Sequence, residues 1–326
     1  MIGTDVRSKI VGDVPLENVL AMYSRSANPF AIPPQIYAEK KFPSAALPRI
    51  GKPLRSISGA SWKDRMNRLQ DKVAIVTGTG DGIGRGIALA FAREGARLAI
   101  CDLNLSELRE TEQLIQKTGT QVLAVPIDLR DVSQISAFVE RTVATFGRID
   151  CLVNNAAVMP VVPTETIEPE TVDQILQVNL RAPIIFTRFA IPHMRRAGGG
   201  SVIHMASVTG HLGHPGITVY GATKGGLIAL ARGQAVELAV DNIRVNTVSP
   251  GTVDSPMLHR FLTENATDIQ KAREAFDRLH PRGKVGSIEE VAAVFVFLAS
   301  DEAANITATD IRCDGGYGAR GQQPTS

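Results

Sequence analysis

The chain contains few cysteines, and the three that it has form no recognisable pattern. Cys101, Cys151 and Cys313 lie far apart, so they make neither a C-x-x-C motif nor a spacing typical of a metal site. Each lies in or beside an apolar run, which predicts buried, reduced thiols in an intracellular protein. The sequence therefore excludes a disulfide scaffold.

Long apolar runs, a strong net charge and an N-terminal targeting segment are also missing. No apolar stretch approaches the roughly 18–20 residues of a transmembrane helix. The first 20 residues contain three acids and no apolar core of a signal peptide. The formal net charge of +2 is too small to indicate a nucleic-acid-binding surface. We therefore expect a cytoplasmic protein with neither a membrane nor a nucleic acid as its partner.

The composition is that of an ordinary globular protein, but its charge is unevenly distributed. Of 326 residues, 44% are hydrophobic and 21% are charged, and the length alone allows two domains. Residues 1–70 hold eleven Lys and Arg, five acids and seven of the 18 prolines, so their net charge is +6 against −4 for the rest. The sequence predicts a basic N-terminal extension over 1–70, a catalytic domain over 71–318 and a tail over 319–326. The extension, which has too little apolar surface for its own core, is interpreted as a loose tail or as an arm that packs on the body or on a neighbouring subunit.

From about residue 71, short apolar runs alternate with segments of helical period. The runs predict strands at 73–77, 98–102, 122–127, 151–154, 202–206, 245–248 and 311–313. The predicted helices cover 83–94, 105–117, 132–146, 170–196, 219–240 and 288–299, and Pro183 should interrupt or kink the fourth of them. This alternation predicts an α/β fold of Rossmann type, with one doubly wound parallel sheet of about seven strands and helices on both faces.

A glycine-rich turn joins the first predicted strand to the first predicted helix. It reads G-x-x-x-G-x-G, with Gly78, Gly82 and Gly84 around Asp81 and Ile83. Glycines permit a tight turn, and the helix N-terminus can then bind a pyrophosphate through its free N–H groups. A plain structural turn is the alternative, although its position in a βαβ unit favours a binding site. No G-K-[ST] follows, which argues against a P-loop.

An acid at the end of the second strand bears on the choice of dinucleotide. Asp102 comes 18 residues after Gly84, where a carboxylate can accept hydrogen bonds from the ribose hydroxyls and would repel a 2′-phosphate. Asp81 adds negative charge, and Leu103 and Asn104 supply no cation. Two acids without a nearby base predict NAD rather than NADP.

Three side chains predict proton transfer at the carboxyl ends of the strands. Tyr220 and Lys224 are four residues apart and share a helix face, where a cation would lower the pKa of the phenol. Such a phenol can give or take a proton near neutral pH. Ser207 follows a predicted strand, so its hydroxyl could lie beside Tyr220. Taken alone, Tyr220 and Lys224 would be interpreted as a surface pair.

Three further features come with these motifs: Asn154 to Ala157 after one predicted strand, Asn179 in a predicted helix, and Pro250 to Val253 after the sixth predicted strand. With them, residues 71–318 resemble the short-chain dehydrogenase/reductase family. The resemblance implies that Tyr220 is the catalytic acid/base, that Lys224 binds the nicotinamide ribose and that Ser207 binds the substrate oxygen. Asn179 would hold a water molecule in a proton relay. The resemblance also implies a homotetramer or a dimer.

The resemblance assigns further cofactor contacts. Asp128-Leu129 matches a pair that contacts adenine. Asp314-Gly315-Gly316 is not among these contacts and matches only the usual end of the family's last strand. Asn155-Ala156-Ala157 resembles an N-A-G segment, with Ala157 in place of the usual glycine. The loop from Pro250 through Gly251 and Val253 to Ser255 resembles one that contacts the nicotinamide, with Ser255 in place of threonine. The expected cofactor is NAD, and no metal is expected.

The substrate is indicated only as a small molecule. The resemblance implies that residues 251–285 form a lid over the nicotinamide, and the apolar side chains in this segment suggest a moderately apolar secondary alcohol or ketone. The candidate substrate contacts are Met257, Leu258, Phe261, Leu262, Met159, Val161, Leu212, His211 and His214. The lid residues could instead simply pack against one another. His211 and His214 resemble a metal motif only loosely.

The sequence thus predicts an NAD(H)-dependent oxidoreductase that interconverts a secondary alcohol and a ketone. A 3-oxoacyl-thioester reductase is the alternative, although such enzymes usually take NADPH. A non-catalytic dinucleotide-binding regulatory protein would normally lack Tyr220 or Lys224, and a Rossmann-like methyltransferase would need neither. An extended epimerase would carry a G-x-x-G-x-x-G turn and its extra residues at the carboxyl end.

Overall fold

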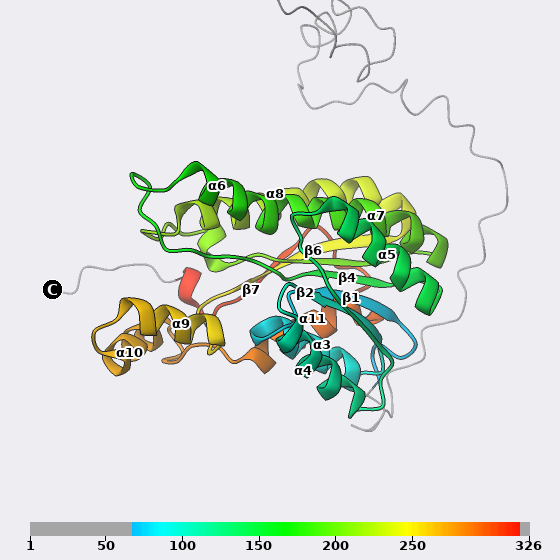
Figure 1. Cartoon of the computed structure of the whole chain (residues 1–326), viewed down its shortest axis with the longest axis horizontal. Coiled ribbons are helices and arrows are strands. Elements are labelled where there is room, and N and C mark those ends of the chain that lie inside the picture. The colour runs from blue at the N-terminus through cyan, green and yellow to red at the C-terminus, as the bar shows by residue number, and fades with distance from the viewer. Residues whose placement is uncertain (1–66, 320–326) are drawn as a thin grey trace, which may run out of the picture. The chain divides into compact units, whose positions relative to one another are not determined.

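A single parallel sheet organises the described part of the chain (Figure 1). The computed structural model describes residues 67–319, in which seven strands follow the order β3-β2-β1-β4-β5-β6-β7. Their bounds are β1 Val73–Thr77, β2 Arg97–Asp102, β3 Val122–Pro126, β4 Cys151–Asn154, β5 Gly200–Met205, β6 Ile243–Pro250 and β7 Asp310–Cys313. The predicted doubly wound α/β fold is thereby confirmed. Nearly all of the predicted 1–70 extension and of the 319–326 tail lies outside the described residues.

Helices cover both faces of the sheet (Figure 1). One layer contains α3 (Gly82–Arg93), α4 (Leu105–Gln116) and α11 (Ile288–Ala299). The other contains α5 (Val132–Phe146), α7 (Ala182–Ala197) and α8 (Thr218–Leu238), with α6 (Pro169–Leu176) packed on α8. Each layer buries its own apolar cluster against the sheet. Burial on both faces explains why the strands are continuous apolar runs rather than alternating ones.

The helix boundaries follow from local chemistry. Asn104 accepts hydrogen bonds from the N–H groups of Ser106 and Glu107 at the start of α4, and Ser287 forms a capping box with Glu290 at the start of α11. The predicted interruption of region 170–196 is confirmed. A π-helical turn, Gln177–Arg181, separates α6 from α7, and Pro183 stands in the first turn of α7.

Two helices were not predicted. The segment interpreted as a lid contains α9 (Pro256–Asn265) and α10 (Ile269–Leu279), which lie together at one end of the sheet (Figure 1). The rings of Phe261 and Phe276 pack edge to face between them, with their centroids 5.8 Å apart. Ser255 caps α9, and Pro256 follows at its first position. This start signal is present in the sequence and was overlooked.

Two of the three cysteines are buried, as the sequence predicts for all three. Cys101 and Cys151 are buried, Cys313 is half-buried, and all three are free thiols. Burial raises the pKa of Cys151 to about 12, so this thiol stays protonated. Within residues 67–319, no helix combines the length and apolarity that crossing a bilayer requires.

Candidate active site

A cavity of about 850 Å³ opens at the carboxyl ends of the strands. It begins at the glycine turn between β1 and α3, where the strand order reverses, and such crevices bind ligands in open α/β sheets. With one exception, every side chain or backbone segment predicted for catalysis or cofactor binding lines it. These residues are Gly78, Asp81, Gly82, Ile83, Gly84, Asp102, Leu103, Asp128, Leu129, Asn155, Ala156, Ala157, Ser207, Tyr220, Lys224, Pro250, Gly251, Val253 and Ser255.

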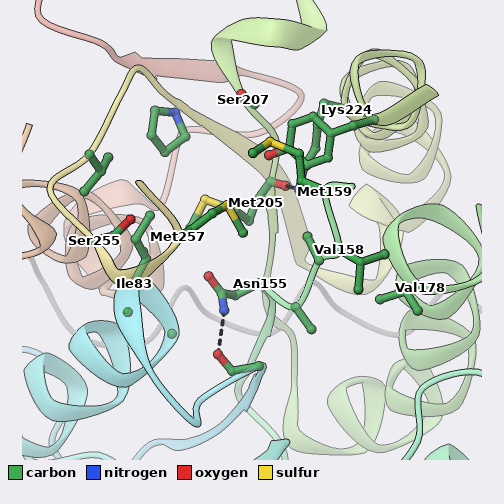
Figure 2. A pocket seen from close by; sticks show the side chains of 18 of the residues that line it. Ile83, Asn155, Val158, Met159, Val178, Met205, Ser207, Lys224, Ser255 and Met257 are labelled. Atoms are coloured by element: carbon green, nitrogen blue, oxygen red, sulfur yellow. Dashed lines mark hydrogen bonds between the residues drawn. The ribbon is translucent and has the colours of Figure 1, made fainter. Parts of the chain in front are cut away.

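The glycine turn is held close to the neighbouring strand ends. Gly78 has φ +67°, and a Cβ there would lie 2.6 Å from the Cα of Ala156. The amide of Asn155 donates hydrogen bonds of 2.9 Å to the carbonyls of Thr77 and Gly78. Asn155, seen at the base of the cavity in Figure 2, therefore fixes the turn.

The N-terminus of α3 is suited to an anion. Asp81 occupies the cap position but makes no capping hydrogen bond with its side chain. Gly82, Ile83 and Gly84, the first residues of the helix, all line the cavity. First-turn N–H groups without a protein cap, at the positive end of a helix, match the diphosphate of a dinucleotide.

Replacing Gly84 by alanine should destabilise the protein. A Cβ at this position would lie 1.9 Å from the carbonyl oxygen of Gly78, which is backbone and can move only with the whole turn. We expect the free energy of unfolding, measured by urea denaturation, to fall by about 1–3 kcal/mol or more.

Gly233→Ala is the matched control. Gly233 lies in α8, and a Cβ there would meet nothing within 4 Å. This variant should be neutral or more stable than the wild type by about 0.5–1 kcal/mol. Equal stability of the two variants would contradict the tight packing of the turn.

Asp102 contacts the turn from the end of β2. Its two carboxylate oxygens accept hydrogen bonds from the backbone N–H of Gly80, at 2.7 Å, and of Asn104, at 2.9 Å. No ion pair engages this carboxylate within residues 67–319. It therefore places an unneutralised negative charge on the wall of the cavity.

The expectation that no base lies near these acids was wrong. Arg260, from the unpredicted helix α9, lies 3.0 Å from Asp81 and also lines the cavity. Arg85, in α3, donates to the carbonyl of Gly80 and to Glu110, the latter at 2.9 Å. Arg85 directly follows Gly84 in the sequence, whereas the closeness of Arg260 to Asp81 depends on the tertiary fold. Each is nevertheless paired with an acid.

The wall beyond Asp102 is partly apolar. Leu103, which is 70% exposed, and Leu129 line the cavity there. Asp128 forms an ion pair with Arg130 at 2.6 Å, and this pair lowers the pKa of the Asp128 carboxyl. This part of the cavity offers apolar surface together with fixed polar groups, which suits a flat heterocycle.

Tyr220, Lys224 and Ser207 meet at the other end of the cavity. The Nζ of Lys224 lies 5.3 Å from the centroid of the Tyr220 ring and donates a 2.6 Å hydrogen bond to the carbonyl of Met205. A hydrogen bond with Ser207 reaches the Tyr220 hydroxyl. Figure 2 shows Ser207 and Lys224 beside one space, with Met159, Met205 and Met257 around it.

The electrostatics of this group differ from the prediction. Burial raises the pKa of Tyr220 to about 12, and the hydrogen bond with Ser207 opposes that rise only in part. Burial likewise lowers the pKa of Lys224 to about 7. The predicted lowering of the tyrosine pKa by Lys224 is therefore not found, because desolvation of the buried phenol is the largest effect on its pKa.

Asn179 is the exception among the predicted site residues. It lies in the π-helical turn, is 1% exposed and does not line the cavity. Its Oδ1 accepts from the N–H of Val158, and its Nδ2 donates to the carbonyl of the same residue, both at 2.8 Å. The side chain therefore positions the segment after β4. Its predicted role in a water relay stays a prediction.

The lid supplies most of the predicted substrate contacts. Met257, Leu258 and Phe261 line the cavity, as do Met159 and His214. Four other candidates do not: Val161, Leu212, Leu262 and His211. Leu262 is buried, and the Nε2 of His211 hydrogen-bonds Asp310 at 2.8 Å.

Sequence reasoning missed several residues at this end. Arg260 and Phe276 line the cavity from the two unpredicted helices, and Tyr317 lines it from beyond β7. Arg260 could have been found from the start signal at Ser255, because it shares a helix face with Met257 and Phe261. No local signal marks Tyr317. Residues 67–319 contain no group of three or more His, Cys, Asp or Glu that could hold a metal ion.

Comparison with known proteins agrees with this geometry. The family model described as enoyl-(acyl carrier protein) reductase matches residues 78–318. The 3-oxoacyl-[acyl-carrier-protein] reductase of Thermotoga maritima is 40% identical over 253 residues, which cover 76% of this chain and 98% of that protein. The cyclohexanol dehydrogenase of an Acinetobacter species is 34% identical over 252 residues, which cover 77% of this chain and 96% of that protein.

A solved structure of an oxidoreductase is also similar to this chain. The crystal structure of levodione reductase has a TM-score of 0.74 and 34% sequence identity, and it covers 77% of this chain and 98% of that one. The oxidoreductases of this family generally bind a nicotinamide dinucleotide, which the glycine turn, the uncapped start of α3 and the cavity all fit. The chain therefore belongs to the short-chain dehydrogenase/reductase family, as an oxidoreductase of the alcohol dehydrogenase and carbonyl reductase type.

Proposed function

We propose that this protein interconverts a secondary alcohol and a ketone with NAD(H), and that Tyr220 is the proton donor and acceptor. The observation that carries the proposal is the meeting of Tyr220, Ser207 and Lys224 on one wall of a cavity that begins at the glycine turn. When bound, the nicotinamide ring accepts or gives the hydride. The chain itself supplies position and proton transfer.

The reacting oxygen would contact Tyr220 and Ser207. During oxidation, the hydroxyl of Ser207 orients the alcohol, and the phenolate form of Tyr220 receives the alcohol proton and becomes the neutral phenol. Because burial raises the pKa of this phenol to about 12, the protonated form is stable and is ready to donate in the reverse direction. Lys224, buried beside the ring, would bind the ribose hydroxyls and offset the negative charge of a phenolate.

In this proposal Asn179 does not contact the substrate and acts through the backbone that it holds in place. Its side chain holds both backbone groups of Val158, and Val158 and Met159 line the cavity. We regard Asn179 as a positioning residue that fixes this wall against the π-helical turn. Asn155 has the equivalent task at the glycine turn.

The proposed preference for NAD over NADP is supported by Asp102. Its charge is not neutralised by an ion pair within residues 67–319, whereas Arg85, Arg130 and Arg260 are each paired with an acid. A 2′-phosphate beside this carboxylate would be repelled. Apolar contacts from Leu103 and Leu129, with Asp128, would hold the adenine.

A homo-oligomer and a cytoplasmic location are also proposed. Val236 and Val240 are 78% and 90% exposed at the end of α8 and in the turn that follows, and Ile184 is 40% exposed on α7. Exposed apolar side chains of this kind are typical of a surface that packs against another subunit. The three free thiols support a reducing compartment.

A 3-oxoacyl-thioester reductase is the second candidate, because the Thermotoga relative that carries this name is 40% identical. A substrate screen distinguishes the two. Secondary alcohols, cyclohexanol among them, are assayed with NAD⁺, and ketones and acyl thioesters are assayed with NADH and NADPH. We expect alcohol oxidation with NAD⁺ and its reversal with NADH. Activity confined to acyl thioesters with NADPH would establish the second candidate instead.

A further inference from the structure

A second polar group lies in the same cavity as Ser207 and Tyr220. His214 belongs to the loop between the 3₁₀ turn η3 (Val208–Gly210) and α8, and Tyr317 begins the turn η6 (Tyr317–Ala319). Both line the cavity, and the Nε2 of His214 lies 2.8 Å from the Tyr317 hydroxyl.

This pair lies close to the reacting end of the cavity. His214 comes between Ser207 and Tyr220 in the chain, on the connection that joins them. On the other side, a Cβ at Gly318 would lie 3.3 Å from Val208, the residue after Ser207. Two segments about 100 residues apart in sequence therefore meet beside the proposed catalytic residues.

The ring of Tyr317 is fixed from behind by His280. Their ring centroids are 5.1 Å apart, with an interplanar angle of 49°. His280 is 2% exposed, and its Nδ1 donates to the carbonyl of Phe276 at 2.8 Å. Its Nε2 accepts from the N–H of Thr252 at 3.1 Å. With both nitrogens occupied, His280 serves as a wall and offers no hydrogen bond to the cavity.

The direction of the hydrogen bond between His214 and Tyr317 follows from its neighbours. The Nδ1 of His214 lies 3.3 Å from the carbonyl oxygen of Leu212, which can only accept, so Nδ1 carries the proton. In the neutral imidazole, Nε2 then accepts from the Tyr317 O–H. The phenolic oxygen of Tyr317 retains its lone pairs, so it can accept a further hydrogen bond.

The rest of this region is mainly apolar. Met159, Val178, Ile217, Met257 and Phe261 all line the cavity. The lining also includes the polar side chains of Gln174, Thr209 and Arg260, of which Arg260 is paired with Asp81. The pair Ser207 and Tyr220 and the pair His214 and Tyr317 each offer a phenolic hydroxyl to a ligand among these apolar side chains. A site built to hydrogen-bond a substrate hydroxyl discriminates strongly against the analogue that lacks it.

We propose that His214 and Tyr317 form a subsite for a second hydroxyl group, so that the substrate is a diol or the corresponding hydroxyketone. This inference rests on the proposed function. One CH–OH group of the diol loses its hydride to the oxidised nicotinamide dinucleotide and its hydroxyl proton to Tyr220, which gives a ketone. The second hydroxyl is chemically unchanged and donates its hydrogen bond to the Tyr317 oxygen.

The test compares a mono-alcohol with its diols, using the full chain and NAD⁺. kcat/KM is measured for cyclohexanol and for cyclohexane-1,2-, -1,3- and -1,4-diol. We expect at least one diol to exceed cyclohexanol by about tenfold or more, since one well-made hydrogen bond has that effect. In Tyr317→Phe, which keeps the ring against His280, the ratio of diol to mono-alcohol should fall toward one.

A second variant and a matched control keep the test decisive if Tyr317→Phe folds poorly. His214→Leu should also lower the ratio, because it frees the Tyr317 hydroxyl from its fixed orientation. His259→Leu is the control, since His259 pairs with Asp254 at 2.8 Å and does not line the cavity. A wild-type ratio near one, or a ratio unchanged in both cavity variants, would overturn the subsite. Failure to oxidise any alcohol in the wider screen would instead contradict the proposed function.

Discussion

Replacement of Tyr220 by phenylalanine is expected to lower kcat for alcohol oxidation by about 10²–10⁴-fold. The change removes only the phenolic oxygen, which takes the substrate proton as phenolate and returns it as phenol. Tyr220 is 8% exposed, and its ring faces the ammonium of Lys224 at 5.3 Å, so phenylalanine keeps the packing. The reaction is followed as NADH absorbance under saturating alcohol.

Two measurements separate this loss from a structural effect. Thermal unfolding should remain close to that of the wild type, and NADH binding, followed by fluorescence, should change far less than kcat does. Near wild-type turnover with intact NADH binding would remove Tyr220 from its proposed role. A parallel loss of NADH binding would show that the variant has disturbed the cavity itself.

The second large effect concerns cofactor choice. The wild type should use NAD⁺ in preference to NADP⁺, and Asp102→Asn should raise the kcat/KM ratio of NADP⁺ to NAD⁺ by roughly a hundredfold. Like charges brought together cost several kcal/mol, and each 1.4 kcal/mol is a factor of ten. Asparagine has the shape of aspartate and keeps one oxygen for the N–H of Gly80 or of Asn104.

Asp131→Asn is the matched control for Asp102→Asn. It removes one negative charge from the cap of α5, outside the cavity, and asparagine remains a good cap. Its cofactor ratio should equal that of the wild type. A wild type that prefers NADP⁺ would contradict the assignment of Asp102.

The sheet could be predicted because its signals are local. A strand such as Val73–Thr77 is buried along all five residues, and this burial requires a continuous apolar run that is visible in the sequence. Gly78, Gly82 and Gly84 lie within seven residues, so their turn is also a local feature. The helices α9 and α10 were not predicted because their mixed polar composition resembles that of a loop. Ser255 and Pro256 nevertheless mark a helix start.

The sequence by itself determined the order of the seven strands and of the helices that cover the sheet, and the glycine turn, and it indicated Tyr220, Lys224 and Ser207 as candidates for catalysis. In each case the chemistry depends on residues that are close in the chain or that follow successive strands. The tertiary structure alone decided that Arg260 pairs with Asp81, that Asn179 holds Val158, and that Tyr317 reaches His214. It also reversed the expected pKa shift of Tyr220. Burial and long-range contacts cause these features, and both arise only when distant segments pack together.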